Sequence, residues 1–383
     1  MLSRHKFHTL VATLATSLLG CAGSPVLTPI FTAVTAKGFH TCGVEAGAAY
    51  CWGGNFFGEL GDGTTTNRST PTLVLGGVSF VAVSAGSFHT CGVTPAGAAY
   101  CWGRNSFGEL GDGTTINQLT PVPVLAGGRF FTAVSAGYSY TCGLTAAGDV
   151  YCWGHNNSGQ LGDGTTTDRL TPVLVLSGVN FVAVSAGAGH TCGLTAAGAA
   201  HCWGHNDSGQ LGDGTTTDRL TPAQVMGVRF AAVSAGAGHT CGVQAGGTAA
   251  FCWGHNEFGQ LGDGTKTNRL SPVRVPGLRF QAVTVGGAHT CGVSDAGTAA
   301  LCWGYNAYGQ LGDGTATNQL TPMLVAVPAE VKLFATVTAS YTHTCAVTLP
   351  GGAYCWGHNQ YGQLGDGTVT TPANWESPVR VMQ

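Results

Sequence analysis

Charged side chains are scarce in this sequence. Asp, Glu, Lys and Arg make up 9% of its 383 residues, against a usual ~25% in globular proteins. The net charge is −3, and no run of basic residues follows residue 6. Because nucleic-acid binding depends on a basic surface that neutralises phosphates, this composition argues against DNA or RNA as a partner.

Catalytic motifs are also missing. The sequence has no Gly-x-Ser-x-Gly nucleophile turn, no His-Glu-x-x-His zinc motif and no phosphate-binding loop. A catalytic site needs distinct acid, base or nucleophile roles in one place, whereas the six glutamates are scattered and seven of the 12 aspartates belong to one repeated turn. We therefore expect a protein that is not an enzyme and that uses no cofactor and no metal ion.

The only long apolar stretch, Phe7 to Leu19, is too short and too rich in threonine for a transmembrane helix. Two basic residues precede it, and Leu18-Leu19-Gly20-Cys21 follows. This order is typical of an export signal, and its ending resembles a bacterial lipobox, where the chain is cut before a cysteine that receives diacylglycerol. Residues 1–20 are predicted to be a lipoprotein-type signal peptide, and residues 21–30 an acylated Cys21 with a short tether.

Export can end in different places. Ala22 stands where aspartate usually retains lipoproteins at the inner membrane, so we expect an exported lipoprotein at the outer membrane or cell surface. An ordinary cleaved signal peptide is the alternative, and it would give a secreted or periplasmic protein.

The composition does not change between Phe31 and Val381, which indicates one domain over residues 31–383. Glycine, with 62 residues, is about twice as frequent as usual. An apolar content of 44% and a strict repeat nevertheless favour a packed, turn-rich β protein over a disordered chain.

One motif occurs seven times and organises this domain. It reads Cys-Trp-Gly, then Asn, then Gly-[Glu/Gln]-Leu-Gly-Asp-Gly-Thr, and successive copies are 50, 51, 50, 50, 50 and 53 residues apart. A period of this size indicates a repeat architecture. Residues present in every copy are interpreted as scaffold, so a unique binding site must come from the departures. The repeated tryptophans are Trp52, Trp102, Trp153, Trp203, Trp253, Trp303 and Trp356.

Each copy divides into four short β-prone segments. In the third copy these are residues 131–135, 140–144, 150–154 and 172–175, bounded by glycine, asparagine or proline turns. Four antiparallel strands per repeat are the blade of a β-propeller, so the sequence predicts an all-β fold with seven blades. A proline such as Pro172 opens the fourth segment, which suits an outermost edge strand because proline lacks the ladder donor.

Fourteen of the 15 cysteines form seven pairs, one in each repeat, and Cys21 is left over. The two members of a pair lie on the second and third segments, where opposed positions fit the geometry of a disulfide. A thiolate metal site is the alternative, but zinc ligands usually come as two close pairs. The predicted disulfides are Cys42–Cys51, Cys91–Cys101, Cys142–Cys152, Cys192–Cys202, Cys241–Cys252, Cys291–Cys302 and Cys345–Cys355.

Histidine and aspartate also recur with the repeat. Histidine precedes Thr-Cys in six copies, with Tyr140 in its place once. We interpret it as a neutral side chain that hydrogen-bonds a neighbouring backbone or threonine group, rather than as a ring of metal or proton sites. The Gly-Asp-Gly-Thr element lacks the alternating carboxylates of a calcium loop, and Asp-Gly favours a turn.

The segment Cys101-Trp-Gly-Arg-Asn-Ser-Phe-Gly-Glu-Leu-Gly-Asp-Gly-Thr lies between Ala85-Gly-Ser-Phe-His-Thr and Thr120-Pro-Val-Pro-Val. It resembles the repeat of the regulator of chromosome condensation (RCC1) family, as do all seven copies, and an exported bacterial member is expected. The resemblance implies a seven-bladed propeller. The family's founder exchanges nucleotide on a small GTPase and binds chromatin, using an inserted β-wedge and a basic tail that this sequence lacks.

Three functions remain in consideration. The favoured one is a non-catalytic scaffold of the cell envelope, a monomeric lipid-anchored propeller that binds a protein or glycan. The alternative is a secreted inhibitor of an extracellular enzyme, as in a bacterial propeller that inhibits β-lactamases. A guanine nucleotide exchange factor is the remote alternative.

Two departures from the repeat are candidate partner sites. The first includes Glu330 and Lys332 in the longest interblade linker, together with Trp375 and Glu376 in the extended last copy. It is either an interface or a cover for the seam of the ring. The second is a variable dipeptide after Trp-Gly-x-Asn, which carries an aromatic residue in five of seven copies. Packing between blades is the favoured explanation of those aromatics.

Overall fold

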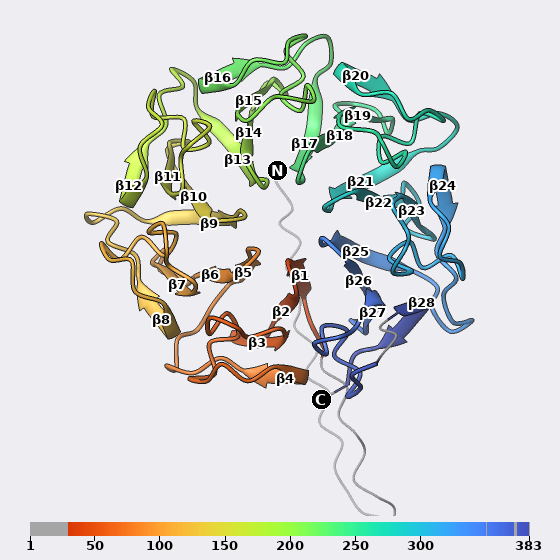
Figure 1. Cartoon of the computed structure of the whole chain (residues 1–383), viewed down its shortest axis with the longest axis horizontal. Coiled ribbons are helices and arrows are strands. Elements are labelled where there is room, and N and C mark those ends of the chain that lie inside the picture. The colour runs from red at the N-terminus through yellow and green to blue at the C-terminus, as the bar shows by residue number, and fades with distance from the viewer. Residues whose placement is uncertain (1–29, 350, 371–373, 383) are drawn as a thin grey trace, which may run out of the picture.

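A computed structural model describes residues 30–349, 351–370 and 374–382. Seven four-stranded antiparallel sheets stand around a central axis, and each is built from four consecutive strands (Figure 1). The predicted seven-bladed β-propeller is therefore confirmed. The predictions made for residues 1–29, including Cys21, lie outside the described residues.

The strands divide evenly among the blades. Blade 1 holds β1 (Ala33–Lys37), β2 (His40–Glu45), β3 (Ala48–Gly53) and β4 (Arg68–Leu73); blade 2 holds β5 (Ala82–Ala85), β6 (His89–Val93), β7 (Ala99–Gly103) and β8 (Gln118–Pro123); blade 3 holds β9 (Phe131–Ala136), β10 (Tyr140–Thr145), β11 (Val150–Gly154) and β12 (Arg169–Leu174). Blade 4 holds β13 (Phe181–Ala186), β14 (His190–Thr195), β15 (Ala200–Gly204) and β16 (Arg219–Gln224); blade 5 holds β17 (Phe230–Ala235), β18 (His239–Gln244), β19 (Ala250–Gly254) and β20 (Arg269–Arg274). Blade 6 holds β21 (Phe280–Val285), β22 (His289–Ser294), β23 (Ala300–Gly304) and β24 (Gln319–Leu324); blade 7 holds β25 (Phe334–Ala339), β26 (His343–Thr348), β27 (Ala353–His358) and β28 (Asn374–Arg380).

The first strand of each blade lines the axis and the fourth forms the rim (Figure 1). The prediction that proline opens the fourth strand was wrong by three residues. β12 begins at Arg169, and the register shift opposite Cys152 and Gly154 places Pro172 in a bulge. A bulge on an edge strand tolerates proline because no ladder bond needs its missing N–H.

All seven predicted disulfides are present. Each joins residues that are directly opposed on the second and third strands, as Cys142 and Cys152 are, with 4.1 Å between their Cα atoms. Closing a loop of about 10 residues contributes roughly 2 to 3 kcal/mol by limiting the unfolded chain. Seven such bridges indicate an oxidising compartment, extracellular or periplasmic.

The repeated Trp and Gly residues make the core between blades. Trp203 is fully buried in a cluster with Leu161 and Val175 of the preceding blade, and its indole N–H donates to the Gln160 carbonyl at 3.0 Å. Gly162 has φ +71°, and a Cβ there would lie 2.7 Å from the indole nitrogen. The Gly-x-Leu-Gly motif therefore exists to seat the next blade's tryptophan.

A belt of hydrogen bonds closes the ring. His40 Nε2 lies 2.8 Å from Thr90 Oγ1 of the next blade, and the same contact joins His343 to Thr41 across the seam at 2.8 Å. Burial lowers the pKa of His40 to about 3, so the imidazole stays neutral. The interpretation of these histidines as structural is confirmed.

The Gly-Asp-Gly-Thr element is a turn, as predicted. Asp163 Oδ1 accepts hydrogen bonds from the Thr165 N–H at 3.0 Å and the Thr165 hydroxyl at 2.7 Å, while Arg169 pairs with Oδ2 at 2.7 Å. Burial alone would raise the pKa of this carboxyl, but the bonds from Thr165 and Arg169 lower it overall. The carboxylate is therefore engaged within its own loop.

Candidate binding face

The two faces of the ring differ in their connections. The loop face carries the long loops between third and fourth strands, such as residues 155–168, and the turns between first and second strands, such as 137–139. The turn face carries the short turns between second and third strands, such as 146–149, and the linkers between blades. Most of the aromatic residues that depart from the repeat lie in the connections of the loop face, as Phe39, Phe56, Phe88 and Tyr138 do.

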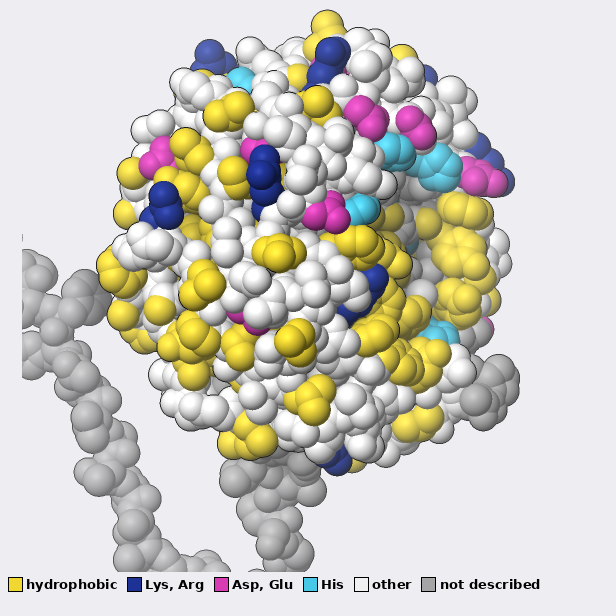
Figure 2. Space-filling model, turned by 60° about the vertical axis from the view of Figure 1, so that its left-hand side comes forward, with side chains coloured by type: hydrophobic (Ala, Val, Ile, Leu, Met, Phe, Trp, Pro, Cys, Tyr) yellow, Lys and Arg dark blue, Asp and Glu magenta, His cyan; other side chains and the backbone are white. Residues whose placement is uncertain are grey.

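The loop face contains an open hollow of about 470 Å³ over blades 2 to 5. Its lining includes Arg104, Phe107 and Tyr138 together with His155 and His205, and the rings of Phe107 and His155 are in contact, with 4.4 Å between their centroids. In Figure 2, hydrophobic side chains form walls of this hollow, and histidine and acidic side chains lie along another part of its rim. The hollow therefore offers both aromatic rings and polar side chains to one ligand.

Two side chains, those of Lys37 and Tyr341, reach across the central axis next to the hollow. Lys37 stands where five other blades have glycine, and its ammonium donates to the carbonyls of Ala136 at 3.0 Å and Ala186 at 2.6 Å. Burial lowers the pKa of Lys37 to about 8. Tyr341 of blade 7 meets Tyr138 of blade 3 edge to face, with 6.2 Å between ring centroids.

An arc of aromatic rings extends from blade 7 over blades 1 and 2 to blade 3. Successive rings meet edge to face: Phe56 and Tyr361 at 5.0 Å, Phe57 and Phe88 at 5.7 Å, and Phe88 and Tyr138 at 5.6 Å. Such pairs are worth about 0.5 to 1.5 kcal/mol beyond area burial. Phe56 is 43% exposed and Tyr138 42%, so parts of the arc stay open. We call these five rings, with Phe39, Phe107 and Tyr341, the aromatic arc.

Sequence reasoning found only part of this arc. Four members of the arc belong to the variable dipeptide, and their packing between blades is confirmed: Phe56, Phe57, Phe107 and Tyr361. The other members of the arc lie in the turn between the first and second strands, just before the repeated histidine or Tyr140. They are Phe39, Phe88, Tyr138 and Tyr341. The sequence signal that could have identified them is the variation of this turn between blades, because the same turn consists of Gly and Ala in blades 4 to 6.

Arg104 lies inside the aromatic arc. Its guanidinium carbon is 5.9 Å from the Phe57 ring centroid, 5.7 Å from that of Phe88 and 5.2 Å from that of Phe107. Its Nε is also 3.8 Å from Glu109 Oε1, a buried carboxylate oxygen. Burial raises the pKa of Glu109 to about 7, so the cation and the acid share one partly dehydrated site.

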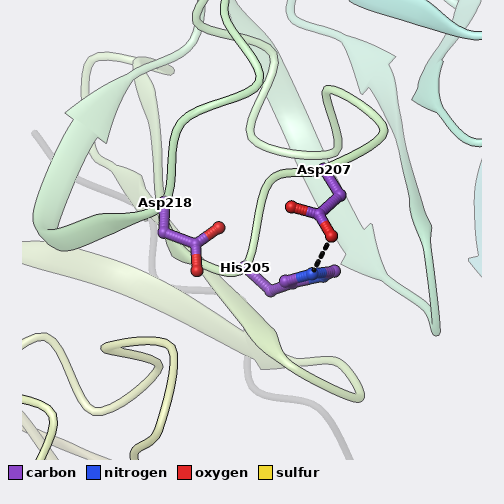
Figure 3. Close-up of side chains that lie close together, drawn as sticks. All are labelled: His205, Asp207 and Asp218. Atoms are coloured by element: carbon purple, nitrogen blue, oxygen red, sulfur yellow. Dashed lines mark ion pairs between the residues drawn. The ribbon is translucent and has the colours of Figure 1, made fainter.

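His205, which lines the hollow, belongs to one group of possible metal ligands among the described residues, with Asp207 and Asp218 (Figure 3). His205 Nε2 lies 3.0 Å from Asp207 Oδ2, and His205 Nδ1 lies 2.8 Å from Gln210 Nε2. The amide of Gln210 is oriented by its oxygen, which accepts the Ser208 N–H at 2.9 Å.

This arrangement fixes the proton of His205. The Gln210 amide donates to Nδ1, so the neutral ring carries its N–H on Nε2, directed at Asp207. A ligating histidine needs the opposite, a bare nitrogen toward the metal and an N–H donated behind it. The donor set therefore fits a hydrogen bond from neutral His205 to Asp207 and does not fit a metal ion.

A model of the RCC1-like domain matches residues 75–383, and a model of the regulator of chromosome condensation (RCC1) repeat matches residues 46–93. The chain belongs to the RCC1-like domain family. No curated protein matches this RCC1-like chain at the sequence level. No helix among its described residues has the length and apolar content to cross a bilayer.

Solved structures agree with this family. Human WBSCR16 is 22% identical over 88% of this chain and 94% of its own, with a TM-score of 0.79. Yeast RCC1 (Prp20), solved bound to Kap60, is 21% identical over 98% of this chain and 91% of its own, with a TM-score of 0.77. The ectodomain of the Arabidopsis thaliana receptor kinase ACR4 is 21% identical over 86% of this chain and 97% of its own, with a TM-score of 0.56. At these identities the likeness shows the fold alone.

The RCC1-like propeller separates the first candidate partner site into two places. Glu376 is in the rim strand β28, near its loop-face end, and its carbonyl accepts the Gly314 N–H at 3.0 Å. Glu330 and Lys332 are exposed in the linker at the turn face. The backbone of Trp375 pairs with Gly357, and its side chain lies outside the described part. Partner binding by these four residues stays a prediction.

Proposed function

We propose that this RCC1-like propeller is a non-catalytic binding scaffold of the cell envelope, tethered by a lipid on Cys21. Its loop face takes a protein or glycan partner. One observation carries the proposal: the aromatic arc and Arg104 occupy the edge of a hollow on a ring that is otherwise repetitive.

The chemistry of the arc supports binding. Aromatic and arginine side chains dominate the energetic centres of interfaces, and here they combine apolar rings with one cation. His205, which also lines the hollow, and its neighbour Asp207 add hydrogen-bonding groups, which fix the orientation of a ligand at a polar rim. A disulfide-stapled ring holds these groups and the arc at fixed positions, which lowers the ordering cost of binding.

Relatives support the same role by analogy. The yeast RCC1 structure contains a bound protein, Kap60, and a second yeast structure is described with binding to Gsp1p and histones. The plant relative is the ectodomain of a receptor kinase, so an RCC1-like propeller also occurs outside the cell membrane. For this chain, the disulfides and the lipobox-like ending support the envelope location.

The test places a photo-reactive amino acid at Tyr138 in the intact, processed chain in its own cells. We expect a specific cross-linked product that disappears when Arg104→Ala and Phe88→Ala are added. The matched control carries the probe at Leu174, an exposed residue of rim strand β12, and should give no such product. Equal products from both positions would contradict a loop-face site.

The anchor is tested separately. Cys21→Ser should release the chain from the membrane fraction or block its processing, and mass spectrometry of the wild-type N-terminus should find a diacylglyceryl cysteine. An unmodified N-terminus at another residue would remove the anchor from the proposal and leave the loop face untouched.

A further inference from the structure

The turn face has an excess of positive charge, although the whole chain is acidic. Six cations and four carboxylates lie in its turns, linkers and strand ends among the described residues. The carboxylates are Glu45, Asp149, Asp295 and Glu330, and the cations are Arg129, Arg229, Arg274, Arg279, Lys332 and Arg380. One pair of these, Arg279 and Asp295, forms an ion pair at 2.9 Å.

The loop face and its adjoining rim have the opposite balance. The remaining fourteen described carboxylates and seven cations lie there or in the interior beneath. Four of the cations are held by the aspartates of their own loops, as Arg169 is by Asp163. The propeller is therefore electrically polar along its axis, with its positive end at the turn face.

Apolar side chains are exposed beside the turn-face cations. Ile30 is 63% exposed and Leu349 58%, and Leu349 donates its N–H to the carbonyl of Leu333, which adjoins Lys332. On blade 3, Phe130 is 64% exposed next to Arg129. Exposed apolar groups flanked by Lys or Arg are the chemistry of a surface that lies in a lipid interface.

The N-terminal chain emerges on this same face. Ile30 is the first described residue, and its N–H donates to Glu45 at the end of β2. Only residues 22–29 separate it from Cys21, and a chain of that length reaches at most about 30 Å when fully extended. A lipid on Cys21 would hold the turn face against the bilayer.

We propose that the turn face lies on an anionic lipid surface, with Ile30, Leu333 and Leu349 at the apolar boundary and the surrounding Arg and Lys side chains over the headgroups. The orientation of the ring on the membrane rests on the lipid anchor of the proposed function. The affinity of the turn face for lipid rests only on side chains of the ring and does not require the anchor. The loop face then points away from the membrane, toward its partner.

The test uses a chain of residues 22–383, which contains the complete ring of residues 30–382 and no anchor cysteine. Sedimentation is measured with vesicles of phosphatidylglycerol and phosphatidylcholine in equal parts, and with phosphatidylcholine alone. We expect binding to the anionic vesicles at low salt and its loss at about 1 M NaCl, where the Debye length is about 3 Å.

The turn-face variant is Arg229→Glu/Lys332→Glu. Each Lys or Arg near an anionic surface is worth about 1 kcal/mol, which is roughly fivefold in partitioning, so this variant should bind at least tenfold more weakly. The matched control Lys266→Glu/Thr166→Glu/Thr216→Glu changes the net charge equally at exposed positions of the loop face and should bind like the parent. Melting temperatures of both variants establish that the ring is intact.

A second variant, Ile30→Ser/Leu349→Ser, tests the apolar component. It should weaken binding severalfold without changing the steepness of the salt dependence. Equal binding to neutral and anionic vesicles, or equal loss in the control, would overturn the proposal. So would a dimer in light scattering that the turn-face variant dissociates, because the face would then bind a second copy. Anchoring fails or succeeds independently, since Cys21 is absent from this experiment.

Discussion

Blades 1 and 2 differ from the other five at one buried position, and the difference separates scaffold from site. Five blades have glutamine there: Gln160, Gln210, Gln260, Gln310 and Gln363. In four of them the glutamine side chain accepts a backbone N–H through its oxygen and lies beside a histidine Nδ1 through its nitrogen, as Gln363 does with His358 at 2.8 Å. A neutral amide suits a buried position because both of its ends are satisfied.

Blades 1 and 2 place carboxyls in the same environment. Glu59 Oε2 accepts the Phe57 N–H at 2.6 Å, and Glu109 Oε2 accepts the Phe107 N–H at 2.7 Å. Burial raises the pKa of each to about 7, although these backbone hydrogen bonds lower it in part. Both carboxyls lie beneath the aromatic arc. Unfavourable buried charge therefore coincides with the proposed site, a common cost of functional surfaces.

The largest expected effect comes from making blades 1 and 2 like the others. A shift from 4.5 to about 7 disfavours each ionised carboxylate by roughly 3 kcal/mol, and a new unpartnered amide N–H costs about 1. Glu59→Gln/Glu109→Gln should therefore raise the free energy of unfolding by roughly 4 kcal/mol at pH 8. Urea unfolding with the disulfides intact measures it.

The sign of the pH dependence checks the cause. A carboxyl whose folded pKa exceeds its unfolded pKa lowers stability as pH rises from about 4.5 through 7. The double variant should consequently be about 1 to 2 kcal/mol less stable than the parent at pH 4.5, where only the cost of the unpartnered amides is left, and exceed it at pH 8. The buried histidines also make stability depend on pH here, because burial lowers their folded pKa while they titrate in this range in the unfolded chain, but they are common to both proteins. A stabilisation that is the same at both pH values would refute buried ionisation.

The opposite exchange should have a smaller effect of opposite sign. Gln310 is fully buried, and its Nε2 has no hydrogen-bond partner among the described residues. Gln310→Glu removes that unpartnered donor and adds a buried charge, so we expect a loss of roughly 2 kcal/mol at pH 8 and a gain of at most about 1 kcal/mol at pH 4.5. Gln310→Met, which adds no charge, is the control. A loss in both variants at both pH values would indicate packing instead.

The repeated motif was sufficient to predict the scaffold because every blade forms the same local contacts. Cys142 and Cys152, Trp203 and the Asp163 turn all act within one blade or between neighbours, so their periodic spacing was sufficient. The prediction that the fourth strand begins at Pro172 was wrong because a bulge separates the proline from the true strand start at Arg169. The hydrophobic pattern alone does not reveal a bulge.

The candidate site could not be predicted in full, because it depends on contacts between blades that are distant in sequence and meet only in the closed ring. Tyr341 and Tyr138 meet across the axis from blades 7 and 3, and Lys37 reaches the carbonyls of blades 3 and 4. These contacts depend on curvature that no local pattern encodes. The sequence did mark each residue as a departure from its repeat position, which is why comparing equivalent positions identifies the arc while periodicity does not.

Replacing Arg104 should have the smallest effect on stability among these substitutions, and part of that effect should depend on the charge of Glu109. Its guanidinium offsets the Glu109 charge and contacts three aromatic rings, and cation–π contacts are worth about 0.5 to 1 kcal/mol at exposed sites. Arg104→Ala should cost about 1 kcal/mol at pH 8 and less at pH 4.5, where Glu109 is protonated. In the Glu109→Gln background, the pH-dependent part of this loss should vanish while the ring contribution remains. A loss that ignores both pH and background would mean that Arg104 acts only through packing, and the pairing of cation and buried acid would be excluded.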